Sequence, residues 1–127
     1  NYQKVPAKVN ELCGQLQERL GTASTIRERY ELSFNGHLNL VTIHPWVDGN
    51  GRTSRLLMNY IQFLYNLFPT KIFKEDRDGY ILALRQSQEE DNNSPFLVFM
   101  AGQLKKSLSL EIERFNTSCK RGFNFLF

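Results

Sequence analysis

The segment GRTSRLLMNYIQFLYNL, residues 51–67, decides the fold class of this chain. Its apolar residues lie on most sides of a helix with about 3.6 residues per turn, and Pro69 follows shortly after its end. A helix that is apolar all round is typical of the buried centre of a domain. We therefore expect it to be the central, buried helix around which the other elements pack.

The flanking segments show the same periodicity, with apolar residues three and four positions apart. Four further helices are expected, at about residues 7–20, 25–42, 77–90 and 94–116. Ser24 is the expected cap of the second helix, and Gly36 inside that helix predicts close packing of another backbone. Cys13 lies on the apolar stripe of the first helix, which predicts a buried thiol.

The two ends of the chain lack this periodicity. Tyr2–Val5 is the one candidate strand, and the tail at 117–127 is apolar without a period. These patterns predict an all-α fold: a compact helical bundle with core helices at about 7–116 and a small N-terminal β-hairpin stub at 1–6. We expect residues 1–127 to form a single domain, and the chain, which begins with Asn1, to be a segment of a longer one.

Composition excludes several classes of protein. The chain has 127 residues, 41% hydrophobic and 23% charged, which fits a globular domain and argues against disorder. The net charge of +3 comes from scattered basic residues, so it does not predict nucleic-acid binding. The sequence contains no run of 18 apolar residues, so no membrane span is predicted. The two cysteines match no metal or redox motif and favour a reducing compartment, so we expect a cytoplasmic location.

The segment HPWVDGNGRTSR, residues 44–55, stands out just before the central helix because it concentrates polar, charged and glycine residues. A β-hairpin is disfavoured because Pro45 interrupts the strand before the turn. An EF-hand would require Gly at Thr53 and Glu at Asn59, and a P-loop would require a lysine that is absent. A simple polar loop between helices remains an alternative.

The residues of this segment also point to chemistry on a polyanion. Asn50 and Gly51 lie where a loop enters a helix, so free N–H groups and the helix dipole favour an anion there. Arg52 and Arg55 share one face of the first turn, where cations oppose the dipole unless phosphates are bound. Asp48 can hold Mg²⁺ against those phosphates.

Only one of the two histidines lies in this polar segment. His44 opens the polar segment and can serve as a general base near neutral pH. His37 lies on the second helix without comparable neighbours in the sequence, and we interpret it as structural.

The segment resembles the signature of the Fic (filamentation induced by cAMP) family, His-Pro-Phe-x-Asp/Glu-Gly-Asn-Gly/Lys-Arg-x-x-Arg. The resemblance extends over about residues 2–110, and it implies a Fic-like bundle. Trp46 replaces the usual Phe of the family, and we expect it to be an apolar anchor under the loop. The segment Lys4-Val5-Pro6 resembles the end of the β-hairpin "flap" of the family, which would hold a target segment.

The resemblance implies an activity and roles for the residues. Most Fic proteins transfer AMP from ATP to a protein hydroxyl, which is called AMPylation, and release pyrophosphate. His44 would then deprotonate the target Ser, Thr or Tyr, and Asp48 would bind Mg²⁺. The phosphates would be held by the backbone and the cations of the motif: Gly49, Asn50, Gly51, Arg52 and Arg55.

Several different functions are compatible with these residues. The same motif can transfer another nucleotide or a phosphate group, remove AMP from a modified target, or serve a regulatory module that binds nucleotide without turnover. Many family members are silenced by an inhibitory helix, and Ser107–Glu111 and Ser109–Glu113 match its spacing but not the residue that follows. We therefore expect such a helix upstream or in a separate protein. The sequence neither predicts nor excludes a homodimer.

Overall fold

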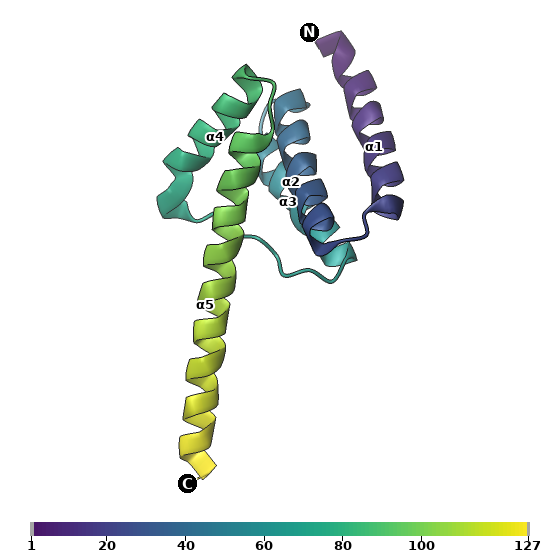
Figure 1. Ribbon diagram of the computed structural model, residues 1–127. Coiled ribbons are helices and arrows are strands. Elements are labelled where there is room, and N and C mark those ends of the chain that lie inside the picture. The colour runs from purple at the N-terminus through teal and green to yellow at the C-terminus, as the bar shows by residue number, and fades with distance from the viewer. Residues whose placement is uncertain (1, 127) are drawn as a thin grey trace.

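The computed structural model describes the backbone of residues 2–126 and the side chains of residues 2–121, and this part of the chain is all-helical (Figure 1). The main helices are α1 (Val5–Thr22), α2 (Ile26–Ile43), α3 (Asn50–Leu64), α4 (Arg77–Glu89) and α5 (Ser94–Leu126). Two short 3₁₀ helices, Tyr2–Lys4 and Lys74–Asp76, precede α1 and α4. The predicted all-α class is confirmed for the described residues.

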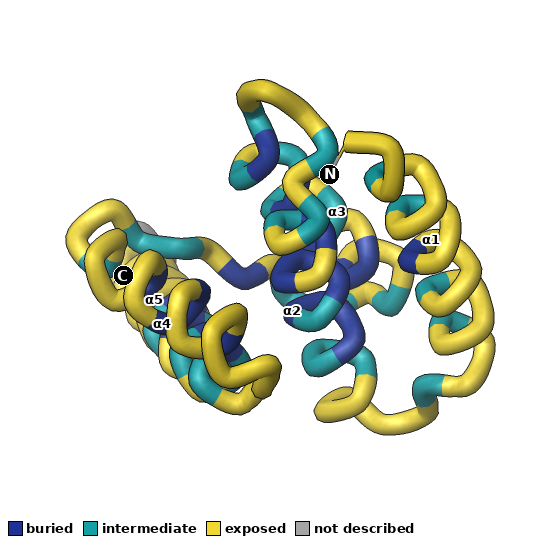
Figure 2. The backbone as a smooth tube through the Cα atoms, turned by 90° about the horizontal axis from the view of Figure 1, so that it is seen from above, coloured by how far each residue is buried: buried dark blue, intermediate teal, exposed yellow. Residues whose placement is uncertain are grey.

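The centre of the bundle is α2, not α3 as the sequence predicted. Seven residues of α2 are buried, and α1, α3 and α5 pack against it (Figures 1 and 2). Several large apolar side chains of α3 are exposed instead: Leu56, Tyr60, Phe63 and Leu64. Within the described residues α3 buries one side against α2, and an apolar sequence alone does not tell how many sides have a neighbour. The core that α2 shares with α3, α4 and α5 includes Phe34, Leu38, Met58, Tyr80, Leu84, Phe96 and Met100.

Gly36 of α2 lies close to side chains of α1 and α3. A Cβ atom at this position would lie 3.1 Å from Cδ1 of Ile61 and 3.6 Å from Cδ2 of Leu16. An alanine here would therefore require the end of the Ile61 side chain to move by a few tenths of an ångström. The nearest atoms belong to side chains, so the close packing of another backbone that this glycine predicted is not observed.

The cap of α2 is Thr25 and not Ser24. The Glu28 N–H donates to Oγ1 of Thr25 at 3.1 Å, and the Thr25 N–H donates to a Glu28 carboxylate oxygen at 3.0 Å. This reciprocal pair is a capping box, which satisfies donors at both ends of the first turn. Ser24 contributes only its own N–H and hydroxyl to the same carboxylate, so it supports the cap from one residue further out.

The predicted β-hairpin stub at residues 1–6 is wrong for the residues that the structure describes. Tyr2–Lys4 form a 3₁₀ turn that continues into α1 at Val5, and Pro6 occupies the first turn of that helix. Proline is compatible with a first turn because its missing N–H has no partner there in any case. Lys4, Val5 and Pro6 therefore offer no strand edge to a target segment.

One further expectation outside the core is wrong. Cys13 is exposed, because the outer side of α1 has no neighbour in the described part of the chain. The tail is helical up to Leu126, and α5 projects beyond the rest of the bundle (Figure 1). No helix among the described residues is long and apolar enough to cross a membrane.

Candidate functional site

A tight turn after α2 presents the first residue of the motif. His44 caps the C-terminus of α2 in the left-handed region, with φ of 54°, and its N–H donates to the Leu40 carbonyl at 3.2 Å. A left-handed conformation costs a non-glycine residue about 1 kcal/mol or more, so the surrounding structure must hold it. The turn reverses the chain and leaves His44 exposed.

Asn50 holds the loop in shape. Its side-chain amide donates to the Trp46 carbonyl at 2.6 Å and accepts from the Trp46 N–H at 3.0 Å, and Asn50 is buried. The acceptor and one of the two donors of this amide are engaged by the Trp46 backbone, so the backbone N–H is the group by which we expect Asn50 to bind an anion. Trp46 is 45% exposed, which corrects the expectation of a buried anchor under the loop. The hydrogen-bonded amide of Asn50 supplies that anchor instead.

The start of α3 is arranged for an anion. Gly49 is the N-cap with φ of 85°, a left-handed conformation that favours glycine. The first N–H groups of α3 have no carbonyl partners within the helix, and the positive end of the helix dipole points in the same direction. A negatively charged group is therefore favoured in front of Asn50 and Gly51.

Asp48 lies beside this helix start. One carboxylate oxygen accepts from the Gly49 N–H at 2.6 Å, and the other lies 3.2 Å from the Arg52 guanidinium. The Asp48 side chain is 90% exposed, so the pair with Arg52 is weak and easily exchanged for another partner. No cluster of three metal-ligating side chains occurs among the described residues. A lone exposed carboxylate fits Mg²⁺ only where phosphate oxygens complete the coordination.

A pocket of about 520 Å³ lies beside the motif and contains two of its residues, Gly51 and Arg55. The 3₁₀ turn and α4 add two cations, Lys74 and Arg77. No ion pair is found for Arg55, Lys74 or Arg77 within the described part of the chain, so their charge is available to a ligand. The remaining lining is mostly apolar: Val41, Ile72, Phe73, Tyr80, Ile81 and Leu84.

This lining combines three cationic side chains with an apolar surface. The motif supplied a clear signal for Gly51 and Arg55, but sequence reasoning missed Lys74 and Arg77. These two are ordinary basic residues of a distant segment, and only the packing of α4 brings them to the pocket. His44, Asp48 and Arg52 do not line it; they lie on the adjoining loop and first turn.

Tyr80, which lines the pocket, makes a buried polar contact with His37. Nε2 of His37 lies 2.9 Å from the Tyr80 hydroxyl, and the His37 ring stacks on Phe96 with centroids 5.2 Å apart. Burial, assisted by the nearby charge of Arg55, lowers the pKa of His37 to about 4. Burial also raises the pKa of Tyr80, an effect that Arg55 opposes. His37 is therefore neutral at pH 7 and structural, as predicted.

The surroundings of Arg55 also show whether the candidate inhibitory segments of α5 reach the pocket. The expected inhibitory glutamate would pair with Arg55, but no carboxylate among the described residues does so. Glu111 instead approaches Arg114 of its own helix at 3.7 Å. In this structure, neither Ser107–Glu111 nor Ser109–Glu113 occupies the pocket.

Comparisons with known proteins place the motif in a family. Residues 1–62 match the family model of the Fic/DOC family. The chain is 46% identical over 74 residues to the protein named "Protein adenylyltransferase Fic" of Drosophila virilis, and equally to that of Drosophila melanogaster. The Drosophila yakuba protein of the same name is 45% identical over 74 residues.

These matches cover 58% of this chain but 15% of the length of each relative, so the chain corresponds to a small part of those proteins. The family match includes His44, the whole loop that follows it and Arg55, and it ends inside α3. By its motif and by these matches, the chain contains a Fic domain.

Proposed function

We propose that this chain is the catalytic part of a protein adenylyltransferase, which transfers AMP from ATP to a Ser, Thr or Tyr hydroxyl of a target protein. The observation that carries the proposal is the pocket in which Gly51 and Arg55 of the motif meet Lys74 and Arg77. Unpaired cations, a helix N-terminus and an apolar wall together suit a nucleoside triphosphate. The names of the Drosophila relatives support the choice of AMP as the transferred group.

Each cation has a separate position relative to the phosphates. Arg55 lies in the pocket beside Gly51. A Cβ atom built on Gly51 would lie 3.6 Å from the Arg55 guanidinium. Arg52 lies one turn earlier and outside the pocket, so it would approach the phosphates from the loop side. The backbone N–H groups of Asn50 and Gly51 would hold phosphate oxygens, and that of Gly49 would join them when it exchanges its contact with Asp48 for a phosphate oxygen. Fixed positive groups of this kind stabilise the charge that develops during phosphoryl transfer.

His44 would act as the general base. It would accept the proton of the target hydroxyl while the hydroxyl oxygen forms a bond to the α-phosphorus. The bond from the α-phosphorus to the bridging oxygen breaks at the same time, and pyrophosphate leaves. The exposed position of His44 at the end of α2 allows a large protein substrate to reach it.

Asp48 would hold Mg²⁺ if the phosphates supply the remaining ligands. When bound, Mg²⁺ would neutralise phosphate charge. The carboxylate would then exchange its weak contact with Arg52 for the metal, and Arg52 would become free to pair with a phosphate oxygen. The proposed role of Asp48 therefore also changes the partner of Arg52.

The apolar wall of the pocket has few groups that could recognise one nucleobase. Ile72, Phe73 and Ile81 can cover any flat ring, so transfer of a different nucleotide is a second candidate function. Transfer of a phosphate group, removal of AMP from a modified target, and nucleotide binding without turnover would each use the same cations and helix start.

One experiment separates AMP transfer, phosphate transfer and nucleotide binding without turnover. The protein is incubated with a cell lysate and with ATP labelled either at the α-phosphate or at the γ-phosphate. AMP transfer labels protein from the α-labelled ATP alone, whereas phosphate transfer labels protein from the γ-labelled ATP alone. The remaining nucleoside triphosphates are compared in parallel, and the His44→Ala variant is the control. Tight ATP binding without any labelling would instead favour the regulatory module.

A further inference from the structure

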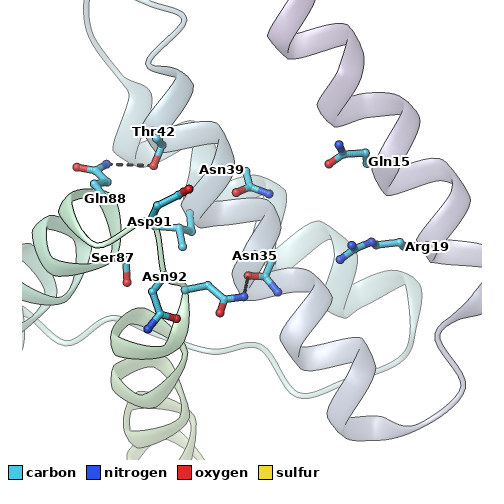
Figure 3. Close-up of a pocket in the computed structure, with 11 residues that line it drawn as sticks. Gln15, Arg19, Asn35, Asn39, Thr42, Ser87, Gln88, Asp91 and Asn92 are labelled. Carbon is cyan, nitrogen blue, oxygen red and sulfur yellow. Dashed lines mark hydrogen bonds between the residues drawn. The ribbon is translucent and has the colours of Figure 1, made fainter.

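A second pocket, of about 450 Å³, lies between α1, α2 and the turn that joins α4 to α5 (Figure 3). Apart from Leu38, its lining is polar, and six of the side chains are carboxamides: Gln15, Asn35, Asn39, Gln88, Asn92 and Asn93. We call it the amide groove. It shares no lining residue with the pocket beside the motif, so it is a separate site.

We infer that the amide groove binds the extended main chain of a protein segment, and that this segment is part of the AMPylation target. The second half of this inference rests on the proposed function. A carboxamide carries an acceptor and two donors, so it can pair with the C=O and the N–H of one peptide residue at the same time. Groups that both donate and accept suit a peptide main chain better than they suit an anion or an apolar ligand.

Much of this hydrogen-bonding capacity is unused. Asn35 accepts from Asn93 at 2.9 Å but donates to no described residue, and Gln88 donates to Thr42 at 3.1 Å. Asn39 has no hydrogen-bond partner for its side chain among the described residues. These groups lie at an open surface, where a ligand can replace water.

The spacing of the polar residues matches a β-strand. Asn35 and Asn39 are one turn apart on α2, and Gln15 and Arg19 are one turn apart on the facing side of α1 (Figure 3). Residues four apart in a helix are separated by about 6 Å along the axis. Alternate residues of an extended chain are separated by about 6.6 Å. A strand laid along α2 can therefore present successive outward-facing peptide groups to Asn35 and Asn39.

Charge adds a preference for one kind of side chain. Figure 3 shows Gln15 and Arg19 extending from α1 toward α2. No ion pair is found for the Arg19 guanidinium within the described part of the chain, so it can bind an acidic residue of the segment. Asp91, at the other side of the groove, would favour a basic or neutral residue there.

The groove leads toward the proposed catalytic base. Thr42 lines the groove near the C-terminal end of α2, two residues before His44. The nine positions from Asn35 to His44 correspond to about 13 Å of helix, or about four residues of an extended chain. A target residue at Asn35 and Arg19 would therefore lie about four residues from the hydroxyl at His44. Since residues 2–6 provide no strand edge, this groove is a different means of placing a target segment.

The experiment uses a nine-residue probe peptide made of Gly, Ala and Ser, with one Glu four residues from one Thr. Binding is followed by NMR on the ¹⁵N-labelled protein, where the side-chain NH₂ signals of Asn35 and Asn39 report on the groove directly. We expect these signals to shift with a dissociation constant in the millimolar range. Asn39→Leu, which removes a bidentate contact, should weaken binding about tenfold. The matched control Asn10→Leu, on an exposed part of α1 outside the groove, should leave it unchanged.

The neutral oligosaccharide maltotriose serves as the competing ligand class. Shifts with maltotriose and none with the peptide would overturn the inference, and so would a peptide that moves neither amide signal or binds equally well to Asn39→Leu. ATP affinity, measured by calorimetry on the same proteins, should not depend on Asn39. Peptide binding without AMP transfer in the labelling assay would support the groove and count against the proposed function, so the two can fail separately.

Discussion

Nε2 of His37 lies 2.9 Å from the hydroxyl of Tyr80, and this contact joins α2 to α4 in the interior of the protein. Tyr80 forms part of the wall of the pocket that contains Arg55, and both rings pack on Phe96. The pair therefore connects the core of the bundle with the proposed phosphate site. The contact also holds neutral His37 near the charge of Arg55, and our proposal assigns His37 no role in proton transfer.

The depressed pKa of His37 predicts a pH dependence of folding. The pKa is lowered to about 4 in the folded protein, compared with about 6.5 when unfolded. The unfolded chain therefore binds a proton as the pH falls from about 6.5 to 4, while the folded protein does not. Stability should be full above pH 6.5 and should fall by about 3 kcal/mol on acidification to pH 4.

Urea unfolding at several pH values between 7.5 and 4 measures this slope. The His37→Gln variant should be less stable at pH 7, because the contact with Tyr80 changes, but should lose most of the slope. Glu28, whose pKa is lowered to about 2 by the capping hydrogen bonds, affects stability at lower pH, between about 4.5 and 2. An unchanged slope in His37→Gln would show that His37 is not the group that titrates.

His44→Ala should slow AMP transfer by about 10² to 10⁴, because the target hydroxyl loses its base. ATP affinity should stay nearly the same, since His44 does not line the pocket that holds the phosphates in our proposal. Initial rates of labelling with α-labelled ATP and calorimetric ATP titrations measure the two quantities. His44 is exposed, so the thermal midpoint should change little. Labelling at the rate of the parent protein would exclude His44 as the base.

Asp48→Asn should weaken ATP binding when Mg²⁺ is present and have little effect when the metal is chelated. The carboxylate is exposed and its contact with Arg52 is weak, so the change removes a metal ligand at little structural cost. ATP titrations by calorimetry, with Mg²⁺ and with a chelator, give the comparison. An equal loss of affinity under both conditions would mean that Asp48 does not act through the metal.

Arg55→Ala should weaken ATP binding by about 10-fold to 100-fold, because charge-assisted hydrogen bonds contribute about 1.5–3 kcal/mol each. Arg85→Ala is the matched control: Arg85 is exposed on α4 and does not line the pocket. Both variants are compared with the parent by calorimetry in the same buffer. If Arg55→Ala and Arg85→Ala bind ATP equally well, the pocket beside the motif is not the phosphate site.

Much of the local structure could be predicted from the sequence. The periodicity of the apolar residues located the main helices, because a helix buries side chains three and four positions apart whatever it packs against. Gly36 predicted a close neighbour of the second helix, but the atom nearest to a Cβ built there is Cδ1 of the Ile61 side chain, at 3.1 Å, and not another backbone. The segment 44–55 was found because its polar residues are contiguous, and the structure places them in one loop and one first turn.

The tertiary structure alone decided which of these elements is central and which residues share a pocket. The apolar sequence of α3 suggested burial on all sides, but α2 has more neighbours, and Cys13 on α1 faces no neighbour in the described chain. Lys74 and Arg77 reach Arg55 only because α4 packs on the core that α2 forms, and nothing in their own segment marks them. Sequence periodicity reflects interactions within a few residues, whereas juxtaposition depends on how whole helices pack, and that information is distributed over the entire chain.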